Sequence, residues 1–234
     1  MTNKEGKKQQ VRSMFNNIAH RYDFLNHFLS AGIDYRWRKK AIQIIGKTNP
    51  QSILDIATGT ADLAIEASKL NPKKIEGIDI AEDMLAIGRE KIQKKNLSDI
   101  ITLETGDAEN IKFENNSFDV VMVAFGVRNF ENLEKGLSEM YRVLNAGGMV
   151  MILEFSKPVK FPIKQLYHFY FRFILPTMGK IISGDSSAYT YLPDSVSVFP
   201  DGDKFLSILK KTGFINTDHK PLTFGIASIY TGTK

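Results

Sequence analysis

The 234-residue chain contains no cysteine, so disulfide bonds, thiolate metal sites and a cysteine nucleophile are excluded. Its first residues lack the apolar core of a secretory signal, and no stretch approaches the roughly 20 apolar residues that span a bilayer. The four histidines are scattered without the spacing of metal ligands, so we expect no metal. With 43% hydrophobic and 24% charged residues, the chain is expected to be a cytoplasmic protein with one large core.

Basic residues are concentrated near the N-terminus. Residues 1–50 contain ten Lys/Arg and three Asp/Glu. The remaining residues contain 21 Lys/Arg and 23 Asp/Glu. Such a surplus attracts nucleic acid or an anionic membrane surface, and it equally suits a solvated helical face that aids solubility. The sequence leaves these alternatives open.

Helical and extended patterns alternate through the middle of the chain. Apolar residues at helical spacing cover 12–46, ahead of the first strand. Five strands are then predicted at Ile53–Ile56, Lys74–Ile80, Ile100–Thr105, Phe118–Phe125 and Met149–Glu154. Helices between them are predicted at Asp62–Leu70, Glu82–Lys95 and Leu133–Leu144. This alternation favours an α/β fold with a Rossmann-like, mostly parallel sheet and helices on both faces.

The alternation stops after Pro158. The segment Phe161–Ile182 is rich in aromatics and predicts a helical lid that a proline interrupts. A helix at Asp201–Thr212 then precedes two strands, Phe214–His219 and Gly225–Thr233, which are expected to pair antiparallel and to complete a seven-stranded sheet. We expect a single domain over 1–234, made of an N-terminal helical cap (1–50), a cofactor-binding core (51–155), an aromatic-rich lid (156–200) and a C-terminal helix with strands (201–234).

The segment Ser52–Leu63 combines a buried strand, a tight glycine turn and a helix. It lacks the G-x-G-x-x-G spacing of dinucleotide-binding enzymes. Gly59 in the turn lets the backbone approach a ligand closely, while Asp55 lies nearer the strand interior and is expected to order the loop. Asp79 ends the next strand 20 positions after Gly59, the separation of a ribose-binding carboxylate. The pattern predicts a nucleoside site at the carboxyl edge of the sheet.

A third contact is predicted after the third strand, at Asp107 and Ala108. A side-chain acceptor there suits an adenine amino group, and a small residue leaves room for the ring. Taken singly, Asp79 and Asp107 could each cap a helix or a turn, and Gly59 could belong to any strand-to-helix turn. Three such positions at the carboxyl ends of three consecutive parallel strands favour a nucleoside cleft.

Further segments narrow the family. They are Tyr-Asp-Phe-Leu-Asn at 22–26, Arg-Trp-Arg at 36–38, Phe-Gly-Val-Arg-Asn at 125–129, Arg-Val-Leu-Asn-Ala-Gly-Gly at 142–148 and Leu-Glu-Phe-Ser-Lys-Pro at 153–158. Over nearly its whole length the chain resembles the S-adenosylmethionine-dependent C-methyltransferases of menaquinone and ubiquinone biosynthesis.

The resemblance implies that S-adenosylmethionine is the methyl donor, with contacts at Thr60, Asp79 and the pair Asp107–Ala108. The chain departs from the usual pattern in the loop, where Ala61 replaces a glycine. We expect alanine to hold helical geometry at this position with little loss. It also has Ala124 where some members have a serine, so any cofactor contact of that hydroxyl is absent.

The implied reaction moves a methyl group to a ring carbon of a reduced polyprenyl quinone. A hydroquinol carbon becomes nucleophilic as the neighbouring hydroxyl loses its proton, so the site must favour phenolate character and exclude water. Arg128 is the candidate for stabilising the phenolate or ordering a water that takes the proton. Asn129 would orient the ring hydroxyl, and Tyr22 would pack or hydrogen-bond at the reacting centre. The alternatives are a structural ion pair for Arg128 and a core aromatic for Tyr22.

The aromatic segment Phe161–Ile182 is interpreted as a buried helix pair or as an apolar channel for a polyprenyl tail. Beside a basic N-terminal segment, such a lid suits a peripheral enzyme at the inner face of an anionic bilayer. Demethylmenaquinol is the favoured substrate, and the benzoquinol of the ubiquinone pathway, or both quinols, is the alternative. Oligomeric state is left open, with a homodimer as one outcome.

Three other function classes compete with this interpretation. Amino-methylating nucleic-acid enzymes often have Asn/Asp-Pro-Pro-aromatic after the fourth strand, where this chain has Ala-Phe-Gly at 124–126, so no nucleic-acid partner is expected. The glycine pattern of the loop disfavours a nicotinamide-dependent dehydrogenase. A non-catalytic cofactor-binding protein remains as the third class.

Overall fold

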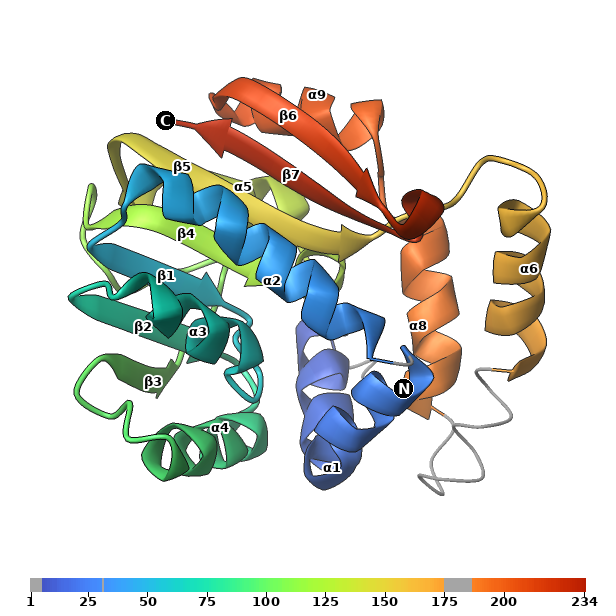
Figure 1. Cartoon of the computed structure of the whole chain (residues 1–234), viewed down its shortest axis with the longest axis horizontal. Helices are drawn as coiled ribbons and strands as arrows, with labels where there is room; N and C mark the ends of the chain where they lie inside the picture. Colours follow the sequence, from blue (N-terminus) through green and yellow to red (C-terminus); the bar gives the residue numbers. More distant parts are fainter. Residues whose placement is uncertain (1–5, 31, 175–186) are drawn as a thin grey trace.

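A seven-stranded mixed sheet forms the centre of the molecule in the computed structural model, which describes residues 6–30, 32–174 and 187–234 (Figure 1). The strands are β1 (Ser52–Ile56), β2 (Lys74–Asp79), β3 (Ile101–Thr105), β4 (Phe118–Ala124), β5 (Leu144–Phe155), β6 (Ile215–Leu222) and β7 (Ala227–Thr233). Their order is β3-β2-β1-β4-β5-β7-β6, and only β7 runs antiparallel to its neighbours. The predicted Rossmann-like sheet with an antiparallel C-terminal strand is confirmed.

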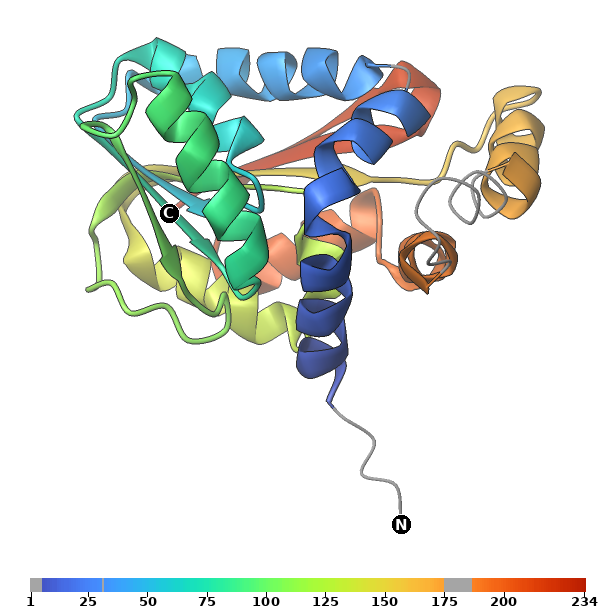
Figure 2. The same ribbon diagram turned by 90° about the horizontal axis from the view of Figure 1, so that it is seen from below.

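Helices cover both faces of the sheet and its carboxyl edge. They are α1 (Lys7–Leu29), α2 (Ile33–Ile45), α3 (Asp62–Ala67), α4 (Glu82–Lys94), α5 (Leu133–Val143), α6 (Ile163–Phe169), α8 (Ser187–Val198) and α9 (Asp203–Thr212). Short helical turns are η1 (Gly46–Thr48), η2 (Ser68–Leu70), η3 (Val127–Asn129), the π-helical η4 (Tyr170–Ile174) and η5 (Thr223–Gly225). Figure 2 shows α2 and α5 on opposite sides of the sheet. Among the described helices, none is long and apolar enough to cross a membrane.

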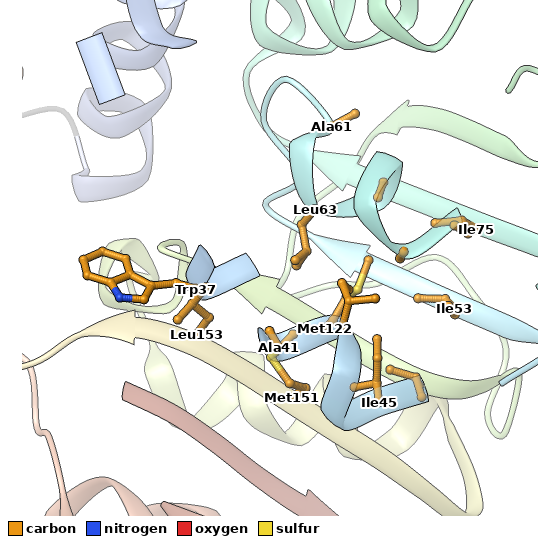
Figure 3. Close-up of a cluster of buried hydrophobic side chains, with 14 of the residues drawn as sticks. Trp37, Ala41, Ile45, Ile53, Ala61, Leu63, Ile75, Met122, Met151 and Leu153 are labelled. Carbon is orange, nitrogen blue, oxygen red and sulfur yellow. The ribbon is translucent and has the colours of Figure 1, made fainter. Parts of the chain in front are cut away.

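Two hydrophobic clusters fill the space between the sheet and its helices. Side chains alternate along a strand, so Val120 and Met122 of β4 join the cluster under α2 and α3. Val121 and Val123 join the cluster under α5 and α9. Figure 3 shows part of the first cluster, where α2 meets the strands: Trp37, Ala41, Ile45, Ile53, Met122 and Met151. Because both faces are buried at the centre of the sheet, β1 and β4 are nearly continuous apolar runs, which is typical of parallel sheets.

The predicted elements agree with the structure to within three residues at their ends, apart from three places. The helical region 12–46 is two helices, and Gly32 adopts a left-handed φ of 72° before the second one begins. Strand β5 begins at Leu144 rather than Met149, because a bulge separates the Phe118–Leu144 pair from the Val120–Met149 pair.

The third difference is helix α8, which was not predicted. It contains Pro193, a residue that normally marks the end of a helix in sequence. The predicted lid helix Phe161–Ile182 appears as α6 and η4 up to Ile174, and its remainder lies outside the described residues.

The carboxyl ends of β1, β2, β4 and β5 point toward α1 and α8 (Figure 1). Loops that leave these strand ends therefore face the N-terminal helical cap and the lid. This edge of an α/β sheet is where ligands bind, so the fold brings all predicted site segments to one side of the molecule.

Candidate functional site

The loop between β1 and α3 is held by its own hydrogen bonds and by β2. Thr58 donates its amide hydrogen to the carbonyl of Ile78 (3.0 Å) and its hydroxyl to Oδ2 of Asp55 (2.7 Å). Gly59 adopts a φ of 57°, and a Cβ at this position would lie 3.3 Å from the terminal methyl of Met84. Glycine takes this conformation without strain and leaves the backbone open to a ligand.

Ala61 also adopts the left-handed conformation, with φ 66° and ψ 19°. The expectation that alanine holds helical geometry here is therefore wrong. The chain must turn sharply before α3 begins, and the left-handed region places Cβ close to the following carbonyl oxygen. Such a residue costs about 1–2 kcal/mol, which a glycine would avoid.

Asp79 is fixed by two backbone amides. Its Oδ2 accepts from Gly59 N and its Oδ1 from Ala81 N, both at 2.9 Å. Burial raises the pKa of Asp79, and the two amide hydrogen bonds oppose that shift. The capping role considered for Asp79 is not observed, because α4 begins after Ala81 without a side-chain cap hydrogen bond. Each carboxylate oxygen of Asp79 keeps a lone pair for a ligand hydroxyl.

Asp107 is held between its own turn and helix α1. Its Oδ1 accepts from the amide of Glu109 (2.9 Å), and its Oδ2 pairs with Nζ of Lys8 (2.7 Å). The hydrogen bond to Asp107 raises the pKa of Lys8. Asp79, Asp107 and Ala108 line one small cavity of about 80 Å³, so the predicted nucleoside contacts do come together.

A larger cavity of about 470 Å³ adjoins the first, since Gly59 and Tyr22 line both. Asp55, Thr60 and Arg128 also line it. Its wall is dominated by aromatic side chains: Phe15, Tyr22, Trp37, Phe125, Phe155, Tyr167, Tyr170, Tyr191 and Phe224. The site is therefore a polar cleft that opens into an apolar chamber.

Arg128 forms a buried ion pair at the inner end of this chamber. Its Nη1 lies 2.8 Å from Oε1 of Glu154, and the two side chains are 7% and 0% exposed. Nε donates to Oγ of Ser195 (3.3 Å), and Nη1 also donates to the carbonyl of Phe125. Burial raises the pKa of Glu154, and the Arg128 charge opposes the shift. The structural ion pair that was the alternative interpretation of Arg128 is present. The same guanidinium also lines the larger cavity.

Asn129 and Tyr22 both line the smaller cavity, whereas Arg128 lines only the larger one. Asn129 lines the smaller cavity, and its Oδ1 accepts from the hydroxyl of Tyr191 (3.1 Å), which lines the larger one. Tyr22 lies where the cavities meet and packs edge-on against Phe15, with ring centroids 5.8 Å apart. Tyr22 thus borders both cavities, whereas Asn129 borders the smaller one and is linked to the larger one through Tyr191.

A charge network that sequence reasoning missed connects the cap to the cofactor loop. Lys91 Nζ lies 2.9 Å from Asp23 and also pairs with Asp62. The Thr60 hydroxyl donates to Asp23 (2.5 Å), and Arg38 lies 3.3 Å from Asp62. This network fixes the predicted cofactor residue Thr60 against α1.

Three members of the same region have metal-ligand geometry. One ligand atom each of Asp23, His27 and Asp62 lies within 4.8 Å of the others. The four-residue spacing of Asp23 and His27 on one helix was the available sequence signal. Lys91 and Arg38 already neutralise these carboxylates, so the absence of a metal stays a prediction.

The residues present fit the expected cofactor. Oδ1 of Asp55 is buried and has no hydrogen-bond partner among the described residues, although Asp55 lines the large cavity beside Gly59. An orphaned carboxylate oxygen suits a cationic ligand, and the open lone pairs of Asp79 suit a ribose diol. The small residues Gly106 and Ala108 leave room for a ring in the smaller cavity.

Comparisons with known proteins agree with this site. Residues 2–234 match the ubiE/COQ5 methyltransferase family. A demethylmenaquinone methyltransferase of Bacteroides fragilis is 49% identical over 232 residues, which cover 98% of this chain and 95% of the relative. The ubiquinone/menaquinone biosynthesis C-methyltransferase UbiE of Geobacter sp. strain M21 is 46% identical and covers 97% of each chain.

A solved structure supports the fold independently. The S-adenosylmethionine-dependent methyltransferase of Aquifex aeolicus is 17% identical, has a TM-score of 0.58 and covers 82% of this chain and 88% of that one. The chain is accordingly a methyltransferase, and its methyl donor is S-adenosylmethionine, as the sequence predicts. Nearly the whole of its length matches one family model, and the chain belongs to the ubiE/COQ5 methyltransferase family.

Proposed function

We propose that this methyltransferase adds a methyl group to a ring carbon of a reduced polyprenyl quinone and converts demethylmenaquinol to menaquinol. The names of the relatives that are 49% and 46% identical support a quinone substrate. The observation that carries the proposal is the aromatic chamber that adjoins the cofactor loop. The alternative substrate is the benzoquinol of the ubiquinone pathway.

The chamber suits a flat apolar ring. Its volume of about 470 Å³ lies in the range of small-molecule sites. The rings of Phe125 and Phe155 have centroids 4.6 Å apart, and Trp37 lies 6.0 Å from Phe125. Aromatic walls of this kind bind a quinol ring by stacking and edge contacts, and they exclude water from it.

Six residues would hold the cofactor. Asp79 would accept hydrogen bonds from the ribose hydroxyls, and the pair Asp107–Ala108 would hold the adenine ring. Gly59, Thr60 and Asp55 would surround the methionine end. When bound, the cofactor supplies an electrophilic methyl group on a sulfonium centre.

Arg128 would stabilise negative charge on the quinol oxygen. Glu154 holds the guanidinium in place, and among the described residues nothing accepts a hydrogen bond from Nη2. A fixed cation in an apolar chamber favours the phenolate, which makes the neighbouring ring carbon nucleophilic. Asn129 would orient the Tyr191 hydroxyl toward the ring, and Tyr22 would pack the ring where the cavities meet.

Replacing Arg128 by alanine tests this role. Loss of one preorganised charge at a developing anion typically costs 10²–10³ in kcat, so we expect a decrease of that order with little change in cofactor Kd. Arg128→Lys keeps the charge and should retain more activity than alanine. Unchanged turnover in the alanine variant would exclude Arg128 from the reaction.

The substrate is tested by supplying reduced demethylmenaquinol or the ubiquinone-pathway benzoquinol with labelled cofactor. We expect label on a ring carbon of the naphthoquinol, located by NMR of the product. Label on the benzoquinol alone would show that the benzoquinol is the substrate instead of demethylmenaquinol. Label on both quinols would show that the enzyme is bifunctional. Cofactor binding without label on either quinol would support the non-catalytic alternative.

We further propose that residues 1–234 act as one methyltransferase domain, with the cap, core, lid and C-terminal parts predicted above. The enzyme would be cytoplasmic, with no nucleic-acid partner, and would contact the membrane only peripherally to reach its substrate. Cell fractionation with and without a salt wash tests this placement, because peripheral contact with anionic lipid is released by salt.

A further inference from the structure

Helix α6 and turn η4 carry apolar side chains on two faces. Ile163 and Tyr167, four positions apart, line the large cavity. Leu166, Phe169 and Phe173, at spacings of three and four, form another stripe and are 61%, 56% and 54% exposed. A lid that only closed a cavity would need the first stripe alone.

The exposed stripe is continuous with the rim of the cavity. Leu166 lines the cavity although it is mostly exposed, and Phe224 of η5 lines it at 77% exposure. Phe224 has a strained φ of 58°, and its turn is tied down because Trp37 Nε1 donates to the hydroxyl of Thr223 (2.8 Å). Apolar side chains therefore extend from the chamber to the molecular surface.

Two more apolar residues enlarge this surface. Val159 and Phe161, in the segment that leads into α6, are 81% and 80% exposed. Large apolar side chains that are exposed together in one segment mark interaction surfaces on soluble proteins. Figure 1 shows α6 projecting from the end of the molecule at which the strands point.

The charged residues of this segment itself are all basic, and one of them, Lys157, pairs with Asp201 (3.3 Å). Residues 157–174 include four Lys/Arg and no Asp/Glu. Lys160, Lys164 and Arg172 are exposed, and no ion pair to a described residue forms at any of them. Exposed aromatics among unneutralised cations match the interface of an anionic bilayer. A second copy of the chain fits less well, since a two-fold contact would bring these like charges together.

We propose that α6, η4, the preceding segment from Val159 and the Phe224 turn form a docking face for an anionic bilayer, with the cavity mouth directed at the lipid. The inference deepens the proposed function and rests on it for the polyprenyl tail. A tail that lies in the bilayer would pass Leu166 and Phe224 into the chamber without crossing water. The quinol ring would then reach Arg128 while the tail remains in lipid.

Vesicle binding without any quinol tests the docking face. We compare phosphatidylcholine vesicles with and without phosphatidylglycerol, using flotation. The wild-type protein should bind the anionic vesicles, and Lys160→Gln with Lys164→Gln should weaken binding about 30-fold, since each lysine near the surface contributes about 1 kcal/mol. Phe161→Ser with Phe169→Ser should weaken binding to the same vesicles by roughly tenfold or more.

Matched controls lie at the far end of the molecule. Ile215→Ser removes a 60% exposed apolar residue at the start of β6, and Lys95→Gln removes an exposed charge after α4. Both should bind vesicles as the wild type does. Equal binding by wild type, docking-face variants and controls would overturn the proposal, and circular dichroism checks that each variant is folded.

Activity separates this proposal from the proposed function. Neither double variant changes a cavity-lining residue, so both should methylate a short-tailed, water-soluble quinol normally and lose activity on a long-tailed quinol in vesicles. Vesicle binding without methylation of any quinol would refute the proposed quinol substrate and would still support the docking face. If the aromatic double variant instead converts a dimer to a monomer in sedimentation and keeps vesicle binding, the face is a subunit interface and the proposal fails.

Discussion

Replacing Asp55 by asparagine is expected to change how the stability of the protein depends on pH. Asp55 is 1% exposed on β1, and burial raises its pKa from 3.8 to about 7. The hydrogen bond from the Thr58 hydroxyl opposes this shift, and the nearby carboxylate of Asp79 adds to it. The folded protein therefore holds a proton on Asp55 at pH values where the unfolded chain has released it.

The sign of the effect follows from proton linkage. Between pH values of about 4 and 7 the folded state binds more protons at Asp55, so the free energy of unfolding falls as pH rises and is level above about 7. One pKa unit corresponds to about 1.4 kcal/mol, so three units cost about 4 kcal/mol at high pH. Asparagine does not titrate and still offers an oxygen to the Thr58 hydroxyl.

Urea unfolding at two pH values measures this difference. Relative to the wild type, Asp55→Asn should gain about 3 kcal/mol in unfolding free energy between about pH 5 and pH 8.5, since about two units of the titration lie in that interval. A constant difference between wild type and Asp55→Asn at both pH values would refute a buried, protonated Asp55.

Three further outcomes are expected. Asp79→Asn should raise the Kd of the cofactor about 10–100-fold in calorimetry, because charge-assisted hydrogen bonds contribute about 1.5–3 kcal/mol; an unchanged Kd would remove Asp79 from the site. Quinone should quench the fluorescence of Trp37, the single tryptophan, saturably, and quenching that does not saturate would place the ring elsewhere. Ala61→Gly should change the unfolding free energy by less than about 1 kcal/mol. Relief of about 1–2 kcal/mol of backbone strain is offset by the lost buried methyl group and by the greater freedom of the unfolded chain. A larger gain or loss in urea unfolding would contradict that balance.

The order of strands and helices could be predicted because local pattern and tertiary position agree through the core. Each central strand is a short apolar run, and the helical segment after β1 ends at the breaker Asn71-Pro72. Prediction failed where tertiary contacts override local signals. Pro193 sits inside α8, and residues 145–148 bulge from β5 rather than forming a separate turn.

The convergence of the proposed cofactor residues could likewise be predicted from sequence, because parallel topology alone brings strand ends together. Their partners were not. Lys8 lies 99 positions from Asp107, and Lys91 lies 68 positions from Asp23. No local pattern reports such pairs, and the left-handed conformation of Ala61 is equally invisible because alanine normally avoids it.

Two cations of the basic N-terminal segment make contacts inside the molecule. Nζ of Lys7 donates to the carbonyls of Arg128 (3.1 Å) and Phe130 (2.6 Å), while Lys8 pairs with Asp107. Helix α1 thus joins the turn that carries the proposed catalytic arginine to the turn that would hold adenine. Because its Tyr22 also borders both cavities, α1 contacts the proposed cofactor site and the proposed quinol site. Two of the cations that suggested an external anionic partner are therefore used in contacts within the proposed site, and the membrane contact is better sought at α6.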